Sequence, residues 1–256
     1  MIFTNLIQTN LRTHLFGKQI EYYNRLGSTN DEAWKLIDSG EATHGMMVIT
    51  DHQFKGKGRG TNSWFMSPSK GLAMSLILMD SITIENASLV PLAAGVAVAR
   101  TLENRGSSPN LKWPNDILFQ QKKVGGILCE SRISGQQVQA IVIGLGLNIN
   151  EIETDFPSEL VSTATSLNIV TGNVHQRELV CAIYTTFFEQ YWEKILQNSN
   201  EIIENWINYC GHLNQTVSFM HNGNSLKGQF KKVNLKGHAC IELDGNDQFF
   251  PNIILD

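Results

Sequence analysis

The sequence predicts an α+β (mixed α/β) fold, in which helices flank a central mixed β-sheet and a small β-barrel follows at the C-terminal end. Strand-like apolar runs gather in one stretch of the chain and helix-like runs in another, which is typical of one sheet covered by helices. From about residue 213 the pattern changes to short alternating stretches between tight turns, which suits a small barrel. The length of 256 residues allows one large domain, or a main domain with a small appendage.

The first two expected elements are a strand and a capped helix. Residues 20–26 (IEYYNRL) have the composition of a strand. In the stretch that follows, Thr29 and Glu32 match the capping-box spacing that opens a helix. Apolar residues at helical spacing come next, and Gly40 is placed to end the helix.

Two buried strands and a long apolar helix are expected after that. Residues 46–50 (MMVIT) and 72–79 (LAMSLILM) are continuous apolar runs of strand length. Residues 86–105 are rich in Ala, Val and Leu, which predicts a helix buried on most sides. Pro91 fits the first turn of that helix, where a missing N–H is tolerated.

The stretch 111–150 holds three strand candidates, namely LKW with DILFQ, KVGGILCES, and VQAIVIGLGLNI. The turn at Ser134-Gly135 predicts that the last two form a hairpin. Two helices are expected near residues 175–197 and 199–209.

We place a domain boundary near Gly211, which divides the chain into residues 1–211 and 212–256. The second part contains two strong hairpin signals, which are Asn222-Gly223 and Asp244-Gly245.

Composition and charge argue against several classes of protein. The net charge is −4 and the pI is about 6.0, whereas a protein that coats DNA is usually basic. No apolar run approaches the roughly 20 residues needed to cross a bilayer, and the N-terminus lacks the features of a signal peptide, so we expect a cytoplasmic location. The four cysteines form no CxxC and the seven histidines show no paired ligand spacing. Neither a zinc site nor a disulfide framework is therefore predicted.

The loop KGKGRGTNSW, residues 55–64, alternates glycines with basic side chains. Successive N–H groups of such a loop can wrap an anion, and Lys57 and Arg59 can add charge-assisted bonds. The alternatives are a solvated surface loop or, on less support, a nucleic-acid contact. Trp64 stands either in the core or against a purine ring.

A second motif is LKWPNDILF, residues 111–119. Pro114 fixes a turn, which Asn115 and Asp116 can simply cap. Lys112 and Asp116 also suit a phosphate and its Mg²⁺, because magnesium favours one or two carboxylates together with substrate phosphates.

Glycine pairs mark two further motifs. In KKVGGILCE, Lys123 stands beside Gly125 and Gly126, and glycines within a strand often mark either a bulge or a close ligand approach. In GLGLNIN, Asn148 follows two glycines at the end of an apolar strand and is either a turn residue or a ligand contact.

The stretch Ser28-Thr29-Asn30 opens the first helix. Free N–H groups at a helix N-terminus attract polar ligand atoms. One of the three residues is an ordinary N-cap, and this role does not exclude ligand binding by the others.

Together these motifs resemble the biotin protein ligases (biotin–[acetyl-CoA-carboxylase] ligases). The segments QFKGKGRGTNSWFMSPSKGLAMS, LKWPNDI, KVGGILCE and GLGLNIN occur in the order and spacing of that family. KWPND followed by KxGGIL is highly specific, whereas the barrel portion is weakly diagnostic. The resemblance covers nearly the whole chain, from Tyr22 into the barrel. It implies a catalytic biotin- and ATP-binding domain related to lipoate ligases, here residues 1–211, and an SH3-like barrel, here residues 212–256.

The resemblance also implies a two-step reaction. Biotin and MgATP give biotinyl-5′-adenylate and pyrophosphate, and the adenylate then acylates one lysine of a biotin carrier domain. ATP and Mg²⁺ are the implied cofactors, and the carrier domain of a biotin-dependent carboxylase is the implied partner. Members of the family include monomers and homodimers, so the oligomeric state stays open, as does the identity of the carboxylase.

Residue roles follow by matching motif. The residues implied to bind biotin and the acyl phosphate are Ser28, Thr29, Asn30, Gln53, Lys57, Gly58, Arg59, Lys123, Gly125 and Gly126. Among them, Lys123, Arg59 and Lys57 are the implied catalytic cations. The residues implied to bind ATP are Trp64 and Asn148 beside the adenine, and Lys112, Asn115 and Asp116 at the phosphates, with Asp116 as the Mg²⁺ ligand.

Two departures from the family pattern matter. Many bacterial members carry GRGRxGR in the loop, whereas this chain has GKGRGTN, so Lys57 and Asn62 replace arginines. Lysine keeps the charge but loses the bidentate geometry of a guanidinium. The catalytic pattern also starts by about residue 20, which leaves no room for an N-terminal helix-turn-helix and predicts no transcriptional repression.

Three other functions are weighed against ligation of biotin. The first is a lipoate or octanoyl ligase of the same superfold, against which the absence of an RRxxGGG-like motif argues. The second is a biotin sensor without catalysis, against which intact Lys123 and Arg59 argue. The third is a nucleic-acid-binding protein, which only the basic loop supports.

Overall fold

The computed structural model describes residues 1–80, 82–135 and 137–255. Its helices are α1 (Thr4–Asn10), α2 (Thr29–Ser39), α3 (Ile84–Asn104), α4 (Leu167–Thr171), α5 (Arg177–Gln197) and α6 (Ser199–Tyr209), with a 3₁₀ turn at Glu153–Asp155. The strands of the main sheet are β1 (Ile20–Tyr23), β2 (Met47–Thr50), β5 (Leu72–Leu78), β6 (Ile82–Thr83), β7 (Asn110–Lys112), β8 (Asp116–Phe119), β9 (Lys122–Ser134) and β10 (Gln137–Leu147). The remaining strands are β3 (Gly56–Lys57), β4 (Ser63–Trp64), β11 (Thr216–His221), β12 (Asn224–Val233), β13 (Ala239–Leu243) and β14 (Asn246–Phe250).

The main sheet confirms the predicted mixed architecture. Its strand order is β1-β2-β5-β10-β9-β8-β7, with β6 paired to β10. The β1–β2 pair is parallel and the other pairs within the described residues are antiparallel. The predicted hairpin around Ser134-Gly135 is confirmed by the long β9–β10 pairing.

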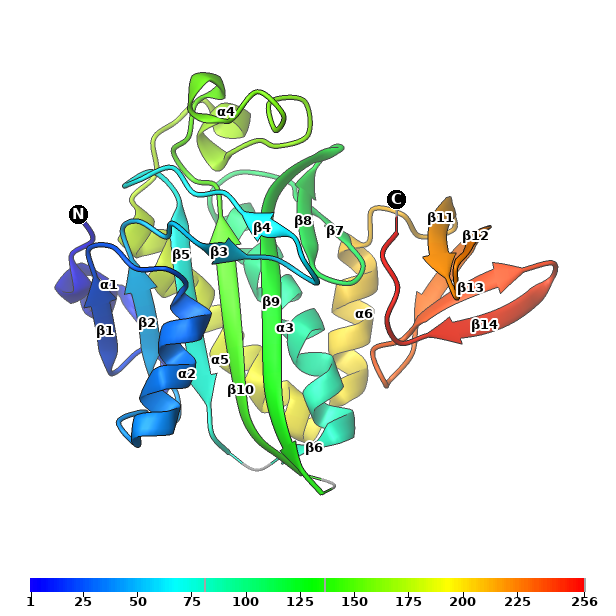
Figure 1. The fold of residues 1–256 in the computed structure, drawn as a ribbon, viewed down its shortest axis with the longest axis horizontal. Coiled ribbons are helices and arrows are strands. Elements are labelled where there is room, and N and C mark those ends of the chain that lie inside the picture. The colour runs from blue at the N-terminus through cyan, green and yellow to red at the C-terminus, as the bar shows by residue number, and fades with distance from the viewer. Residues whose placement is uncertain (81, 136, 256) are drawn as a thin grey trace.

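Helices cover both faces of this sheet (Figure 1). Because side chains alternate along a strand, β2 buries Met47 and Ile49 in the large core cluster on one face, and Val48 in a smaller cluster on the other. The large cluster packs against α3, α5 and α6, and the smaller cluster packs beneath Ala33 and Leu36 of α2. The glycine-rich loop and the N-terminus of α2 therefore share a face of the sheet.

The cap of α2 lies one residue earlier than predicted. Ser28, not Thr29, is the N-cap, and its Oγ accepts a bond from the Asp31 N–H at 3.5 Å. The reason is that Thr29 is already helical, and its own N–H and hydroxyl donate to Gln53. Gly40 ends the helix in the left-handed conformation, with φ 76°, which favours glycine.

The prediction that Pro91 lies in the first turn of its helix is wrong. Helix α3 begins at Ile84, after Thr83 caps it by accepting from the Asn86 N–H at 3.2 Å. Pro91 therefore stands inside the helix. The first turns, IENAS, are polar and lack the apolar pattern from which the helix was predicted.

The C-terminal strands form a four-stranded antiparallel sheet in the order β11-β12-β13-β14. A bridge between Phe219 of β11 and Leu255 brings the last residues back against the first strand, which fits the predicted SH3-like barrel. Phe230 of β12 packs near Trp206 of α6 and His212, so the apolar core continues between the two sheets. The division at residues 211 and 212 stays a prediction.

Within the described residues, none of the helices combines the length and apolarity that a membrane crossing requires. All four cysteines are free thiols, as the sequence predicts.

Candidate functional site

A cavity of about 130 Å³ opens between the N-terminus of α2, the β3–β4 hairpin, the β7–β8 turn, β9 and β10. It brings together thirteen of the fifteen residues that the sequence predicts for the site. These are Ser28, Thr29, Asn30, Gln53, Lys57, Gly58, Arg59, Trp64, Lys112, Asn115, Asp116, Lys123 and Gly126. Segments separated by nearly 100 positions in the chain thus converge on one cavity.

Asn30 forms one wall of the cavity and its amide is held from two sides. Its Nδ2 donates to Glu130 Oε2 at 2.7 Å and to the Leu128 carbonyl at 3.2 Å, and its Oδ1 accepts from the Ser75 hydroxyl at 2.7 Å. Because both partners of Nδ2 are acceptors, the amide orientation is fixed chemically. What remains for a ligand is the second lone pair of Oδ1.

Gly144 of β10 lets this amide approach the sheet. A Cβ at Gly144 would lie 2.3 Å from Asn30 Oδ1, so any larger residue would displace the amide. Close approach of two segments is a recurrent reason for glycine within a strand.

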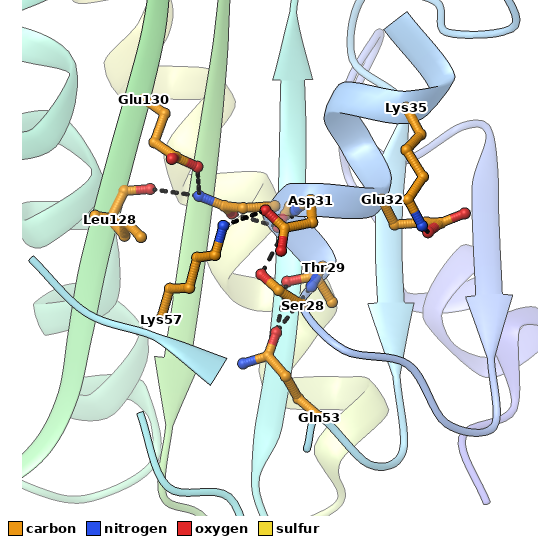
Figure 2. Close-up of polar contacts among 11 residues, drawn as sticks. Ser28, Thr29, Asp31, Glu32, Lys35, Gln53, Lys57, Leu128 and Glu130 are labelled. Atoms are coloured by element: carbon orange, nitrogen blue, oxygen red, sulfur yellow. Dashed lines mark hydrogen bonds and ion pairs between the residues drawn. The ribbon is translucent and has the colours of Figure 1, made fainter. Parts of the chain in front are cut away.

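Gln53 is fixed against the start of α2 (Figure 2). Its Oε1 accepts from the Thr29 N–H at 2.8 Å and from the Thr29 hydroxyl at 3.3 Å. The Nε2 points away from these donors and can donate to an acceptor in the cavity. The N-terminus of α2 therefore supplies a prearranged set of polar groups on a rigid element.

The glycine-rich loop is a tight hairpin. The Gly58 N–H donates to the Asn62 carbonyl at 2.8 Å, and the Asn62 N–H donates to the Arg59 carbonyl at 3.2 Å. Gly56 is required for this geometry, because a Cβ there would lie 2.5 Å from the Trp64 carbonyl oxygen.

Lys57 fastens the hairpin to α2 rather than standing free. Its Nζ donates to Asp31 Oδ1 (Figure 2). This contact raises the pKa of Lys57, and the charge of Glu130 contributes in the same direction. Both partners are roughly half exposed, at 48% and 43% of their side-chain area, so the pair is of the weak surface kind.

Arg59 reaches in the opposite direction, to the C-terminal segment. Its Nη2 donates to Asn252 Oδ1 and its Nη1 donates to the Ile253 carbonyl at 3.5 Å. Partial burial lowers the pKa of the guanidinium, although the charge of Asp116 opposes this effect. Arginine stays charged in proteins, so the hairpin carries a partly desolvated positive charge at the cavity.

Lys123 and Asp116 form an ion pair on the other side of the cavity. Their Nζ and Oδ1 atoms lie 2.5 Å apart, and the ammonium stands 5.8 Å from the centre of the Trp64 ring. The backbone of Lys123 is held by Thr163 and Thr165, at 2.7 and 2.9 Å. The residue that carries the charge is therefore fixed by a segment that sequence reasoning did not connect with it.

The KWPND turn is tied to the same strand. Asn115 Nδ2 donates to the Ile127 carbonyl at 2.7 Å, and the Ile127 N–H donates to the Asn115 carbonyl at 3.0 Å. Asn115 thus supports the turn, as an ordinary turn residue does, while it lines the cavity. Lys112 lines this cavity and an adjoining groove of about 410 Å³ beside β11.

Trp64 lies flat against β10 at Gly146. A Cβ at Gly146 would come within 2.4 Å of the indole, so this glycine makes room for the ring. The ring is only partly buried, and it lines the cavity as the functional interpretation expects.

Two predicted residues do not line the cavity. Gly125 is buried against β10, where a Cβ would lie 2.8 Å from Leu147 Cδ1. Asn148 is 4% exposed, and its Nδ2 donates to the Thr165 carbonyl at 2.9 Å. In this structure Asn148 ties the end of β10 to the segment that supports Lys123.

Sequence reasoning missed several residues of the cavity and its support. Glu130 is the last residue of the KKVGGILCE motif but was given no role, and its charge at the end of an apolar run was the available signal. Ile254 and Leu255 also line the cavity, although they lie in the C-terminal part of the chain. No local pattern could have connected them with the glycine-rich loop.

One carboxylate of the cavity fits a magnesium ion. Within the described residues, no group of three or more His, Cys, Asp or Glu side chains is placed to hold a metal ion, so these residues do not form a metal cage by themselves. Magnesium bound to a nucleotide needs only one or two protein carboxylates, and Asp116 lines the cavity beside Lys112. The donor set therefore fits a metal that enters with a phosphate ligand.

The fold and the cavity place the chain in a known class of proteins. The model of the biotin/lipoate A/B protein ligase family matches residues 22–148, which include α2, the hairpin, the KWPND turn and Lys123. The chain belongs to this family.

Individual relatives point in the same direction. The bifunctional ligase/repressor BirA of Bacillus subtilis is 33% identical over 206 residues, which are 80% of this chain and 63% of that protein. The biotin–[acetyl-CoA-carboxylase] ligase of Paracoccus denitrificans is 37% identical over 130 residues, 49% of this chain and 52% of that protein. This chain thus spans less than two thirds of either relative.

A solved structure supports the fold over almost the whole length. The biotin protein ligase from Aquifex aeolicus, in complex with biotin and ATP, matches with a TM-score of 0.75 and 24% identity. The match covers 93% of this chain and 99% of that chain.

Proposed function

We propose that this protein is a biotin–[acetyl-CoA-carboxylase] ligase, which forms biotinyl-5′-adenylate from biotin and MgATP and transfers biotin to a lysine of a carrier domain. The observation that carries the proposal is the convergence on one cavity of the glycine-rich hairpin, the KWPND turn and Lys123. Each motif alone has an ordinary structural explanation. Together they line a cavity in which cations could bind an anion next to polar groups that could bind a neutral part of the same ligand.

The wall at α2 suits the ureido ring of biotin. A urea needs donors for its carbonyl and acceptors for its N–H groups, and this wall offers the Ser28 hydroxyl, Gln53 Nε2 and Asn30 Oδ1. Polar groups fixed before binding lower the entropic cost of recognition. We assign Thr29 to holding Gln53 in place, and Gly126 to close approach of the ligand to β9.

In the first step, the carboxylate of biotin attacks the α-phosphate of ATP. Two unit charges at 4 Å repel by about 4 kcal/mol at an effective dielectric constant near 20, so cations must offset the repulsion. Lys123 and Arg59 face the cavity from its two sides, and Lys57 stands at the base of the hairpin. Fixed cations of this kind stabilise the charge that develops in the transition state.

Asp116 and Lys112 would hold the MgATP phosphates, with Asp116 as the protein ligand of the metal. When bound, the metal would neutralise phosphate charge. Asp116 is paired with Lys123 without ligands, so we propose that nucleotide binding separates the pair and leaves Lys123 free for the α-phosphate.

Trp64 would flank the adenine, because an aromatic face accepts a purine ring. We place Asn148 behind this region rather than in contact with the ring, since its amide is committed to Thr165. It would shape the adenine pocket by holding the 163–165 segment against Lys123.

In the second step, a lysine of the carrier domain attacks the mixed anhydride and releases AMP. The adenylate must be kept from water until that lysine arrives. The hairpin is placed to cover it, and its glycines permit the movement that entry requires. A carrier domain of a biotin-dependent carboxylase is the expected partner and the cytoplasm the expected location.

Biotin-dependent release of pyrophosphate from ATP tests the proposal. We expect release with biotin but not with lipoate or octanoate, and loss of release in Lys123→Gln. Lys122→Gln serves as the matched control, because Lys122 is exposed and its ammonium donates to the Val161 carbonyl outside the cavity. Release with lipoate would indicate the sister activity instead. Biotin binding without pyrophosphate release would indicate a sensor.

A further inference from the structure

The C-terminal segment Asn252–Leu255 lies between the two sheets and contacts the cavity. Ile253 and Leu255 are buried, at 4% and 3% exposure, and Leu255 bridges to Phe219 of β11. Asn252 and Ile254 alternate with them and are exposed, as in a strand with one covered face. Figure 1 shows the chain end running between α6 and β11.

The alternation places Asn252 against the hairpin. Its Oδ1 accepts from Arg59 Nη2, and the next carbonyl, that of Ile253, accepts from Nη1 at 3.5 Å. The segment is anchored by its buried side chains, so it offers Arg59 a fixed pair of acceptors. The two contacts join residues more than 190 positions apart in the chain.

Both acceptors are neutral, and this distinguishes Arg59 from the other two predicted catalytic cations. Lys57 is paired with Asp31 and Lys123 with Asp116. Among the described residues, no carboxylate lies within 4.0 Å of the Arg59 guanidinium. A guanidinium has five N–H donors, so the segment orients Arg59 without neutralising it and leaves donors for a ligand.

We infer that Asn252 is a positioning residue, which aims Arg59 at the cavity and, because it is neutral, keeps the charge of Arg59 available for an anionic ligand. The inference rests on the proposed function for the identity of that ligand, the phosphate of an acyl adenylate. The holding of Arg59 itself requires no ligand.

Two substitutions separate the two parts of this role. Asn252→Ala removes the acceptor and frees the hairpin. Asn252→Asp keeps an acceptor of the same shape but adds a carboxylate that pairs with Arg59 and competes with the ligand. Asn224→Asp is the control, because Asn224 is an exposed residue of the same small sheet that lines none of the cavities described.

Two measurements are made on the full chain. The first is the rate of trypsin cleavage at the Arg59–Gly60 bond without ligand, followed by mass spectrometry. We expect Asn252→Ala to be cleaved about fivefold faster than wild type, and Asn252→Asp no faster. The second is the rate of adenylate release after a single turnover, which we expect to rise about tenfold in both variants, the equivalent of about 1.4 kcal/mol. Asn224→Asp should match wild type in both.

The pattern across the two measurements decides the inference. If Asn252 has a purely structural role, Asn252→Asp should match wild type in both trypsin cleavage and adenylate release. This result would overturn the inference that the neutrality of Asn252 keeps the charge of Arg59 available. Equal cleavage of wild type and Asn252→Ala would overturn the holding of Arg59. If wild type forms no adenylate but Asn252→Ala is still cleaved faster, the holding of Arg59 is supported and the proposed function is the part that fails.

Discussion

The two sides of the cavity are held in different ways. On the α2 side, Asn30 is 3% exposed and its amide has three hydrogen-bond partners within the protein. On the hairpin side, the cations are held by Asp31, which is roughly half exposed, and by Asn252, which is exposed. Buried hydrogen bonds are costly to break, whereas partly or fully exposed ion pairs and hydrogen bonds contribute little. The comparison indicates that the α2 side is a rigid wall suited to recognising a ligand, whereas the hairpin is held weakly enough to open.

The largest expected effect comes from removing the charge of Lys123, which no other cation of the cavity is placed to replace. Lys123→Gln should lower the rate of adenylate formation by roughly 10²- to 10³-fold, the scale for removing one preorganised electrostatic contact. Single-turnover formation of adenylate measures it. A loss below about threefold would show that the hairpin alone supplies the charge, and the comparison would need revision.

Arg59→Gly should open the hairpin side selectively. Without the guanidinium, both the contact with Asn252 and the proposed phosphate contact are lost, so adenylate should leak at a rate roughly 30-fold higher, the equivalent of about 2 kcal/mol for a charged hydrogen bond. Biotinylation of bystander lysines on added albumin is the measurement. An unchanged level would contradict the role of the hairpin in retention.

Gly144→Ala should damage the rigid wall without touching the hairpin. Its Cβ would meet Asn30 Oδ1 at 2.3 Å, and displacing the amide would weaken its buried hydrogen bonds, each costing about 1–3 kcal/mol when left unmade. We expect the KM for biotin to rise by about tenfold with little change in the KM for ATP. Gly135→Ala would be a poor control because Gly135 has φ 62°, so Ser131→Ala, an exposed β9 position, is preferred.

A buried carboxylate outside the hairpin, Glu151, gives a prediction about the stability of the fold. Glu151 is fully buried beneath Gly71, where the chain enters β5, and one of its oxygens has no partner among the described atoms. Burial, with a smaller contribution from the charge of Asp155, raises its pKa to about 7, although backbone N–H groups and the charge of Lys70 act in the opposite direction.

Because the folded pKa of Glu151 lies above its unfolded value of about 4.5, the folded state binds the proton more tightly. The associated stability is complete below about pH 4.5 and is lost as the pH rises through about 7. Glu151→Gln should therefore raise the free energy of unfolding at pH 8 by about 3 kcal/mol and have little effect at pH 4.5. Urea titrations at the two pH values test this, and an equal effect at both would show that Glu151 is not protonated in the fold.

The smallest effect is expected at the exposed anchor of the hairpin. Asp31→Asn should weaken the contact with Lys57 by at most about 1 kcal/mol and speed trypsin cleavage of residues 55–60 by a few fold. Biotin should protect the same bonds in wild type. Its binding free energy would offset the conformational entropy that the glycine-rich loop loses when it becomes ordered. Equal cleavage with and without biotin would remove the mobile hairpin from the mechanism.

Much of the fold was predictable because local patterns agree with it. The apolar runs placed β2, β5, β9 and β10, and the turn residues placed the hairpins of the small sheet. The errors at Ser28 and Pro91 concern where a helix begins. Ser28 rather than Thr29 caps α2, and α3 begins with polar turns that the apolar pattern does not reveal. Helix α1 and the supporting segment around Thr163 carry no strong pattern and were not predicted.

By itself, the sequence determined which chemical groups the predicted site contains: four cations, a carboxylate, an aromatic ring and a hairpin that only glycines permit. Tertiary structure alone decided which partner each group has and how deeply it is buried. It paired Lys57 and Lys123 with carboxylates, left Arg59 on neutral acceptors, and turned Asn148 inward to Thr165. The physical reason is that residue types are fixed locally in the sequence. Charge compensation and burial depend instead on partners brought from as far as 194 positions away.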